Sequence, residues 1–265
     1  MKPAMSLPRA CVLVLAFALA AGQSGAEVKL EAIDYQQGES KLTGYLAYDD
    51  ALKGRRPGVV VVHEWWGLND YAKQRARMLA ELGYVAFALD MYGDNRVTEH
   101  GKQAGEWMSQ ITANVDRWRD RALAGLEVLK ASDHVDTDHL AAIGYCFGGA
   151  TVMQMAYAGA DLDGVASFHG SLPPPPEGSG EAIKARFMVA HGNDDEFVPA
   201  ERVAAFMQAV VNEDVDVTFH GYKGVRHSFT NPGADSHGIP NLKYDAAADQ
   251  DSWETLQVFF AEIFE

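Results

Sequence analysis

The residue best suited to covalent chemistry is Cys146, which stands in the segment Gly144-Tyr145-Cys146-Phe147-Gly148-Gly149. An apolar run over residues 140–143 precedes this segment and a helical pattern begins near residue 147, so the thiol lies between a predicted strand and a predicted helix. A nucleophile at such a sharp turn takes a strained backbone, and flanking glycines leave room for the chain. The N-terminal end of a helix also favours a thiolate. The pattern predicts a nucleophilic cysteine; a buried structural cysteine in a glycine-rich turn is the alternative.

Two later segments offer a base for this thiol and a group that orients the base. His227 follows the predicted strand at 215–220, and the neighbours Asp194 and Asp195 follow the predicted strand at 187–190. The order nucleophile, acid, histidine on successive strand ends is that of a catalytic triad, and all three ends meet at one edge of a parallel sheet. We expect His227 to act as the base and Asp195 to fix its tautomer, with Asp194 as the competing orienter. A structural histidine and a solvated acidic turn are the alternatives.

Backbone amides near the thiol are candidates for binding the charge that develops on a carbonyl oxygen under attack. The loop at residues 63–69 follows a valine-rich run and is placed to supply one donor, the N–H of Trp65. The N–H of Phe147, directly after the thiol, is the second candidate. Glu64 is unexpected in this position, because a carboxylate beside a thiol disfavours the thiolate. Either its side chain points away, or it holds the thiol in a less reactive state.

Several further side chains are candidates for the wall of a substrate pocket. Trp66 and Tyr92 suit an apolar wall, although packing in the core would use the same residue types. His169 and His191 lie at the ends of predicted strands and are further candidates. We expect no metal and no other cofactor, because the acidic cluster at residues 193–196 is too short and lacks the spacing of a calcium loop.

The segments that position these residues alternate between strand-like and helix-like patterns. Residues 27–36 and 41–48 alternate apolar and polar side chains, which predicts a leading antiparallel hairpin. Further strands are predicted at 58–62, 85–89, 140–143, 165–168, 187–190 and 215–220, and helices at about 70–82, 113–130, 147–158, 200–211 and 253–263. Strands that alternate with helices predict the α/β class, with a mostly parallel sheet and helices on both of its faces.

The N-terminal segment, residues 1–26, has the pattern of a cleavable export signal. A basic start precedes an apolar run at residues 10–21, which is too short for a bilayer span of about 20 residues. We expect cleavage after Ala26, with Ala20 as the alternative site; a retained membrane anchor is the less favoured interpretation. Residues 27–265 are then expected to form one domain in the periplasm or outside the cell.

Composition and charge limit the partners of this domain. The 265 residues are 48% hydrophobic, which is ordinary for a chain that buries a core. A formal net charge of −15 disfavours nucleic acid and anionic membrane surfaces, so neither is an expected partner once the signal is removed. The two cysteines, Cys11 and Cys146, exclude a disulfide scaffold, and cleavage leaves only the second. The expected partner is a small-molecule substrate, and a monomer is the default state.

Five segments resemble the dienelactone hydrolase family, whose members are α/β-hydrolases with a Cys-His-Asp triad that open unsaturated lactones. In the family's order they are H-E-W-W-G-L-N (63–69), L-D-M-Y-G (89–93), G-Y-C-F-G-G (144–149), H-G-N-D-D-E-F-V-P (191–199) and H-S-F (227–229). The resemblance covers roughly residues 28–264 and implies the α/β-hydrolase fold. It also implies that Cys146 is the nucleophile, His227 the base and Asp195 the acid. Glu64 matches a family glutamate thought to govern the charge of the thiol.

The sequence departs from the family at two positions that bear on the substrate. Prototype lactonases bind a substrate carboxylate with an arginine shortly after the L-D-M-Y segment and another four residues after the histidine. Here these positions hold Asp94, with Arg96 two residues further on, and Asn231. Without these charged partners, the prototype lactone is not the expected substrate. The export signal is a further departure from cytoplasmic members.

The resemblance therefore implies a periplasmic or secreted hydrolase of the carboxymethylenebutenolidase type. It would cleave an ester or a lactone through a cysteine acyl-enzyme intermediate. The alternative is a relative that binds a ligand, or reacts through its thiol, without catalysing hydrolysis.

Overall fold

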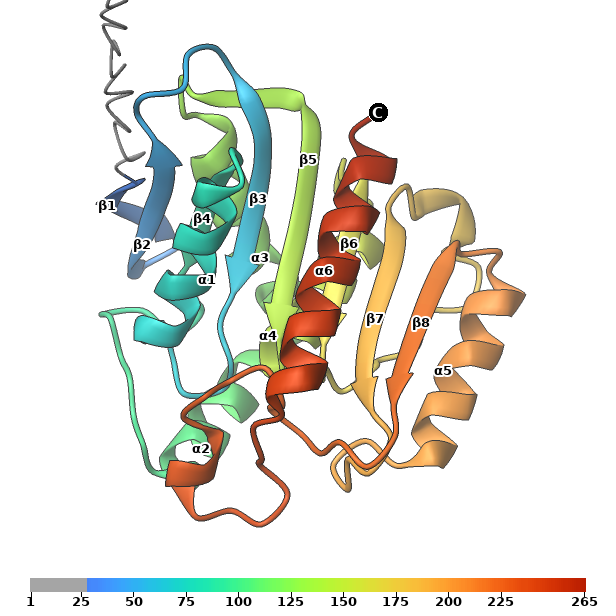
Figure 1. Ribbon diagram of the computed structural model, residues 1–265. Helices are drawn as coiled ribbons and strands as arrows, with labels where there is room; N and C mark the ends of the chain where they lie inside the picture. Colours follow the sequence, from blue (N-terminus) through green and yellow to red (C-terminus); the bar gives the residue numbers. More distant parts are fainter. Residues whose placement is uncertain (1–27) are drawn as a thin grey trace, which may run out of the picture.

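An eight-stranded sheet forms the centre of the structure, a computed structural model that describes residues 28–265 (Figure 1). The predicted signal peptide, residues 1–26, lies outside the described residues. The strands are β1 (Val28–Gln37), β2 (Ser40–Asp49), β3 (Arg56–Val62), β4 (Val85–Leu89), β5 (Val135–Tyr145), β6 (Gly164–Phe168), β7 (Arg186–Gly192) and β8 (Val217–Tyr222). Their order is β1-β2-β4-β3-β5-β6-β7-β8. The pairs β1–β2 and β2–β4 are antiparallel and all others are parallel, which confirms the predicted sheet and its leading hairpin.

Helices cover both faces of this sheet, as predicted. They are α1 (Asp70–Glu81), α2 (Gly101–Thr112), α3 (Val115–Lys130), α4 (Phe147–Tyr157), α5 (Ala200–Asn212) and α6 (Ala246–Ile263), with short 3-10 helices at Gly180–Ala182 and Ala234–His237. Helices α1 and α6 pack on one face, in front of the strands in Figure 1, and α3, α4 and α5 pack on the other. Within residues 28–265, none of the helices has both the length and the apolar character needed to cross a membrane.

Strand β3 shows why the central strands are continuous apolar runs. Val60 and Val62 contribute to the core on the α3 and α4 side, whereas Val59 and Val61 contribute to the core on the α1 and α6 side. All four valines are fully buried, because successive side chains point to opposite faces and both faces are covered. Every residue of α4 is also buried, so protein surrounds this helix on all sides.

Two helices differ from the sequence predictions. Helix α2 is absent from those predictions, because only Ala104 and Ile111 of its residues are buried and its glycines lower the helix propensity. Helix α6 begins at Ala246 rather than near residue 253. Asp245 fixes this earlier start, since its carboxylate accepts hydrogen bonds from two N–H groups of the first turn.

A buried ion pair joins the two helices on the front face. Arg75 of α1 donates to the carboxylate of Asp249 of α6 and also to the carbonyl oxygen of Thr230. The side chains of Arg75 and Asp249 are only 5% and 15% exposed. Since a buried charge is stable only with its partner, the pair ties α1, α6 and the segment after β8 to one another.

Replacement of Asp249 by alanine should lower the free energy of unfolding by about 3 kcal/mol, because it leaves the buried Arg75 charge without its counterion. Urea unfolding at neutral pH measures this change. Asp161→Ala is the matched control, since it removes the exposed partner of Lys184 and should leave the unfolding midpoint nearly unchanged. Equal midpoints for the two variants would contradict the stabilising role of the buried pair.

Candidate active site

Cys146 occupies a sharp turn between β5 and α4, as predicted. Its φ of 54° is unusual for a residue other than glycine. A Cβ atom at Gly144 would overlap the carbonyl oxygen of Gly148, and a Cβ atom at Gly148 would overlap the carbonyl oxygen of Val62. The two glycines therefore allow the first turn of α4 to approach the ends of β3 and β5, and this approach presents the thiol at the edge of the sheet.

His227 and Asp195 follow β8 and β7 and are in direct contact. Nδ1 of His227 lies 2.6 Å from Oδ2 of Asp195. Oδ1 of Asp195 accepts hydrogen bonds from the Asn241 side chain at 3.1 Å and from the N–H of Phe197 at 2.8 Å. Asp194, the competing candidate, is exposed, so Asp195 is the residue that orients the histidine. Because a carboxylate accepts, Nδ1 carries the proton and Nε2 is left for Cys146.

The pKa values of His227 and Asp195 depend on each other and on the nearby Cys146. Burial alone would lower the pKa of His227, but the negative charge of the Cys146 thiolate and the hydrogen bond to Asp195 raise it to about 10. Nε2 of His227 is buried without a hydrogen bond of standard geometry, so its attraction to the sulfur is mainly electrostatic. Burial would raise the pKa of Asp195, yet the hydrogen bonds from His227 and Asn241 hold it below its usual value. This arrangement favours the imidazolium form of His227 at neutral pH.

His169 lies behind the nucleophile. Its Nδ1 accepts a hydrogen bond from the N–H of Cys146 at 3.1 Å, and its Nε2 lies 2.8 Å from the hydroxyl of Thr230. Burial and the nearby positive charges of His227 and Arg75 hold the pKa of His169 well below its usual value. His169 is therefore neutral, with its proton on Nε2, and it fixes the backbone of the turn.

Glu64 is buried and is held by hydrogen-bond partners other than the thiol. Its carboxylate accepts hydrogen bonds from the hydroxyl of Ser228 and, at 2.6 Å, from the side chain of Asn231. Burial raises the pKa of Glu64, although both hydrogen bonds act in the opposite direction. Among the described residues, no hydrogen bond joins Glu64 to Cys146.

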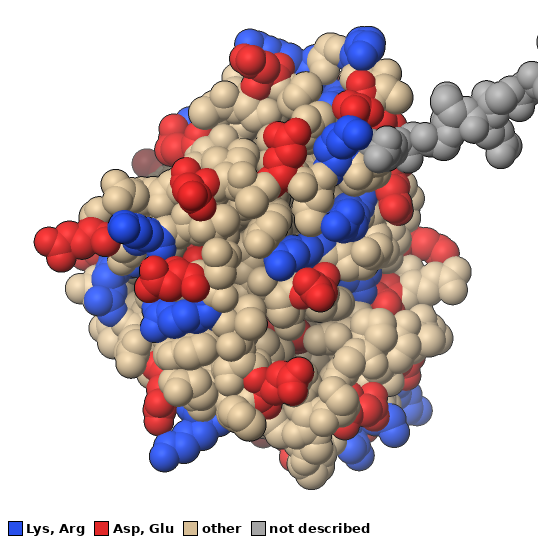
Figure 2. Space-filling model, turned by 90° about the vertical axis from the view of Figure 1, so that its left-hand side faces the viewer, with Lys and Arg blue, Asp and Glu red and all other residues tan. Residues whose placement is uncertain are grey.

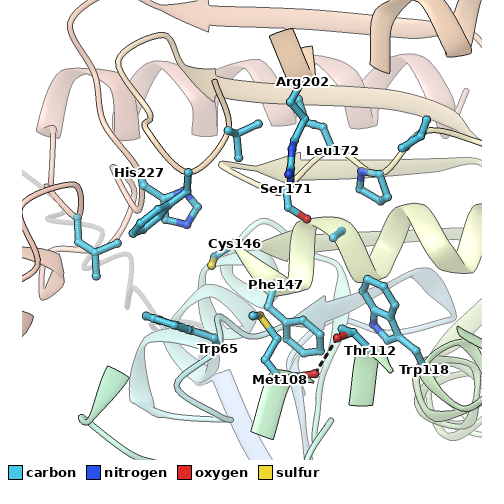
Figure 3. A pocket seen from close by; sticks show the side chains of 16 residues that line it. Trp65, Met108, Thr112, Trp118, Cys146, Phe147, Ser171, Leu172, Arg202 and His227 are labelled. Carbon is cyan, nitrogen blue, oxygen red and sulfur yellow. Dashed lines mark hydrogen bonds between the residues drawn. The ribbon is translucent and has the colours of Figure 1, made fainter. Parts of the chain in front are cut away.

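An apolar cavity of about 710 Å³ lies beside Cys146 and His227 (Figure 3). Trp65 and Phe147, the residues expected to bind an oxyanion, both line it next to the thiol. The wall is completed by side chains of α2, α3, α4, α5 and nearby loops, namely Met108, Thr112, Trp118, Ala150, Ser171, Leu172, Pro173, Pro174, Phe197, Val198, Arg202 and Leu242. This volume is typical of a small-molecule site.

The structure places the other predicted wall residues outside the lining of this cavity. Trp66 is buried in a different cluster, and its ring stacks on that of His237 at 3.8 Å. Tyr92 is buried beneath the cavity, and its hydroxyl donates to the carbonyl oxygen of Trp65 at 3.0 Å. Like His169, these residues support the site from behind. The physical reason is that α2, absent from the sequence predictions, supplies the wall that they were expected to form.

Sequence reasoning also missed Asn241. Its amide nitrogen donates to Asp195, and its main-chain carbonyl accepts the N–H of His227 at 3.1 Å. It therefore fixes both the acid and the base. A lone asparagine in a loop carries no local pattern that could reveal this role, because the contact depends on how the loop folds back. The described residues contain no group of three or more His, Cys, Asp or Glu side chains placed to hold a metal ion.

A thiol at a strand–turn–helix elbow, followed along the chain by an acid and a histidine on later strand ends, defines an α/β-hydrolase. The profile of the Dienelactone hydrolase family matches residues 42–264, and the chain belongs to this family.

Individual relatives agree with this assignment. "Protein usf" of Aquifex pyrophilus is 30% identical over 235 residues, which cover 87% of this chain and 97% of that protein. The "Putative carboxymethylenebutenolidase" of Aquifex aeolicus (strain VF5) is 28% identical, over 86% of this chain and 96% of its own. The crystal structure of the dienelactone hydrolase-like promiscuous phosphotriesterase P91, from metagenomic libraries, has a TM-score of 0.86 and 40% identity, and the match covers 89% of this chain and 98% of that one. The protein is thus a hydrolase of the ester or lactone type.

Replacement of Asp195 by asparagine should lower the pKa of His227 from about 10, because the imidazolium loses its counterion. The imidazolium then loses its proton at a lower pH, and NMR titration of the His227 ring should give a profile with a lower midpoint than in the unchanged protein. Asp194→Asn changes the neighbouring exposed carboxylate and should leave the profile unaltered. A shift of the same size in both variants would show that the contact with Asp195 does not determine the pKa of His227.

Proposed function

We propose that the protein hydrolyses a carboxylic ester or a lactone through a thioester on Cys146. The observation that carries this proposal is the contact of Asp195 with His227 beside a partly exposed thiol in an apolar cavity. In the first step the sulfur attacks the carbonyl carbon and the carbonyl electrons move to oxygen. The N–H groups of Trp65 and Phe147 hold the oxyanion that forms.

Collapse of this intermediate breaks the bond between carbon and the leaving oxygen. Nε2 of the His227 imidazolium gives its proton to that oxygen, so an alcohol leaves and the acyl group remains on sulfur. The raised pKa of His227 supports this role, because it keeps the proton available at neutral pH.

In the second half of the reaction, water attacks the thioester. The neutral His227 takes a proton from this water, the carbon–sulfur bond breaks, and the acid leaves while the thiolate–imidazolium pair is restored. Asp195 accepts the hydrogen bond of Nδ1 throughout and so keeps the ring in one orientation. The resemblance to P91 also makes a phosphotriester a reasonable test substrate for the same thiolate.

We also propose that the chain is exported and that residues 1–26 are removed. The support is the basic start followed by a short apolar run in the sequence. The expected result is a mature protein that begins at residue 27, or at residue 21 if the alternative site is used. N-terminal sequencing of protein from the culture medium and the periplasm of a bacterial host tests this. An uncleaved chain in the cytoplasm would contradict it.

Cys146→Ala should lower turnover of a small aryl ester by about three orders of magnitude or more, because it removes the sulfur that forms the acyl-enzyme. Alkylation of the single thiol of the mature protein should have the same effect. Rapid quenching followed by mass spectrometry should detect one acyl group on the unchanged protein and none on the variant. A thermal unfolding midpoint close to that of the unchanged protein shows that the variant is folded. Turnover retained by folded Cys146→Ala would overturn the proposal.

A further inference from the structure

Arg202 brings a positive charge to the wall of the catalytic cavity. It comes from the first turn of α5, and in Figure 3 its side chain extends toward Ser171, with Cys146 below both in this view. The remaining wall is apolar apart from the triad residues and the hydroxyls of Ser171 and Thr112. Arg202 itself is exposed, so its guanidinium lies where the cavity meets solvent.

This guanidinium has no ion pair or hydrogen bond to any other described residue. Two other arginines are held by protein groups. Arg96 donates to the carbonyl oxygens of Tyr92 and Gly93, and Arg75 pairs with Asp249. Arg55 and Arg77 also have no side-chain partner among the described residues, but they lie outside the lining of this cavity, so Arg202 is distinguished by its position on the wall.

The positions where prototype lactonases carry arginine do not supply this charge. Asp94 is exposed and lies outside the cavity lining. The side chain of Asn231 is held by the carboxylate of Glu64 at 2.6 Å. Positive charge therefore reaches this cavity from helix α5, rather than from the two positions that carry arginine in the prototype lactonases.

We propose that Arg202 binds an anionic group of the substrate, and that the substrate is an amphiphilic ester. This inference rests on the proposed function. The apolar part of the substrate occupies the cavity between α2, α3 and the loop after β6, where Met108, Trp118 and Leu172 bury it. A carboxylate at the far end reaches the mouth and accepts hydrogen bonds from the planar guanidinium, whose geometry matches it.

The test uses pairs of 4-nitrophenyl esters that differ only in terminal charge. Monoesters of adipic, suberic and sebacic acid carry a free carboxylate, and their methyl-capped counterparts have nearly the same length without the charge. Release of nitrophenolate gives kcat/KM for each. The unchanged protein should prefer the anionic member of at least one pair, and the preference should decline with added salt. In Arg202→Gln the ratio of anionic to neutral kcat/KM should fall by about 1.5-fold to fivefold, the range for an exposed ion pair.

Arg202→Lys should restore part of the ratio, because it returns the charge without the forked geometry. Arg55→Gln is the matched control: it removes an exposed arginine before β3, at the edge of the sheet opposite the thiol, and should leave the ratio unchanged. An unchanged ratio in Arg202→Gln, or an equal fall in Arg55→Gln, would overturn the role of Arg202 while ester hydrolysis by Cys146 stands. Absence of turnover with every ester would overturn the proposed function and this inference with it.

Discussion

The close approach of three backbone segments around Cys146 is the constraint on which the rest of the site depends. The first turn of α4 lies against the ends of β3 and β5, and side chains at Gly144 or Gly148 would occupy the space of carbonyl oxygens. The positive φ of Cys146 is strained, by about 1–3 kcal/mol for such residues, and persists only where surrounding contacts fix it. The N–H of Cys146 provides such contacts, since it donates to Phe168 and His169.

Burial and hydrogen bonding give different roles to ionisable groups that lie close together. The carboxylate of Asp195 stabilises the charged form of His227, whereas His169 contacts the N–H of Cys146 and the hydroxyl of Thr230 and stays neutral. The carboxylate of Glu64 accepts hydrogen bonds from Ser228 and Asn231. Side chains of the same type therefore differ in their preferred protonation state because their partners differ.

The sequence predicts the parts of this structure that depend on local pattern. The apolar runs of β3 to β7, the elbow at Cys146 and the order of the triad are all visible, because strand burial and turn geometry restrict the residues that can be used. The residues that form the wall of the cavity cannot be predicted from local pattern in this way. Helix α2 buries few side chains, and Asn241 and Arg202 act through contacts made only after distant loops come together. Trp66 and Tyr92 are residue types that suit either an apolar pocket wall or the core, and the structure places both in the core.

The complete burial of α4 has a consequence for the environment of the nucleophile. Figure 2, which views the molecule from the side, shows acidic and basic groups distributed over the exterior, where water and counterions weaken their fields. The peptide dipoles of α4 lie in a low-dielectric interior instead, and their positive end is at Cys146. Salt should therefore weaken the field of these dipoles at the sulfur less than it weakens the fields of the surface charges.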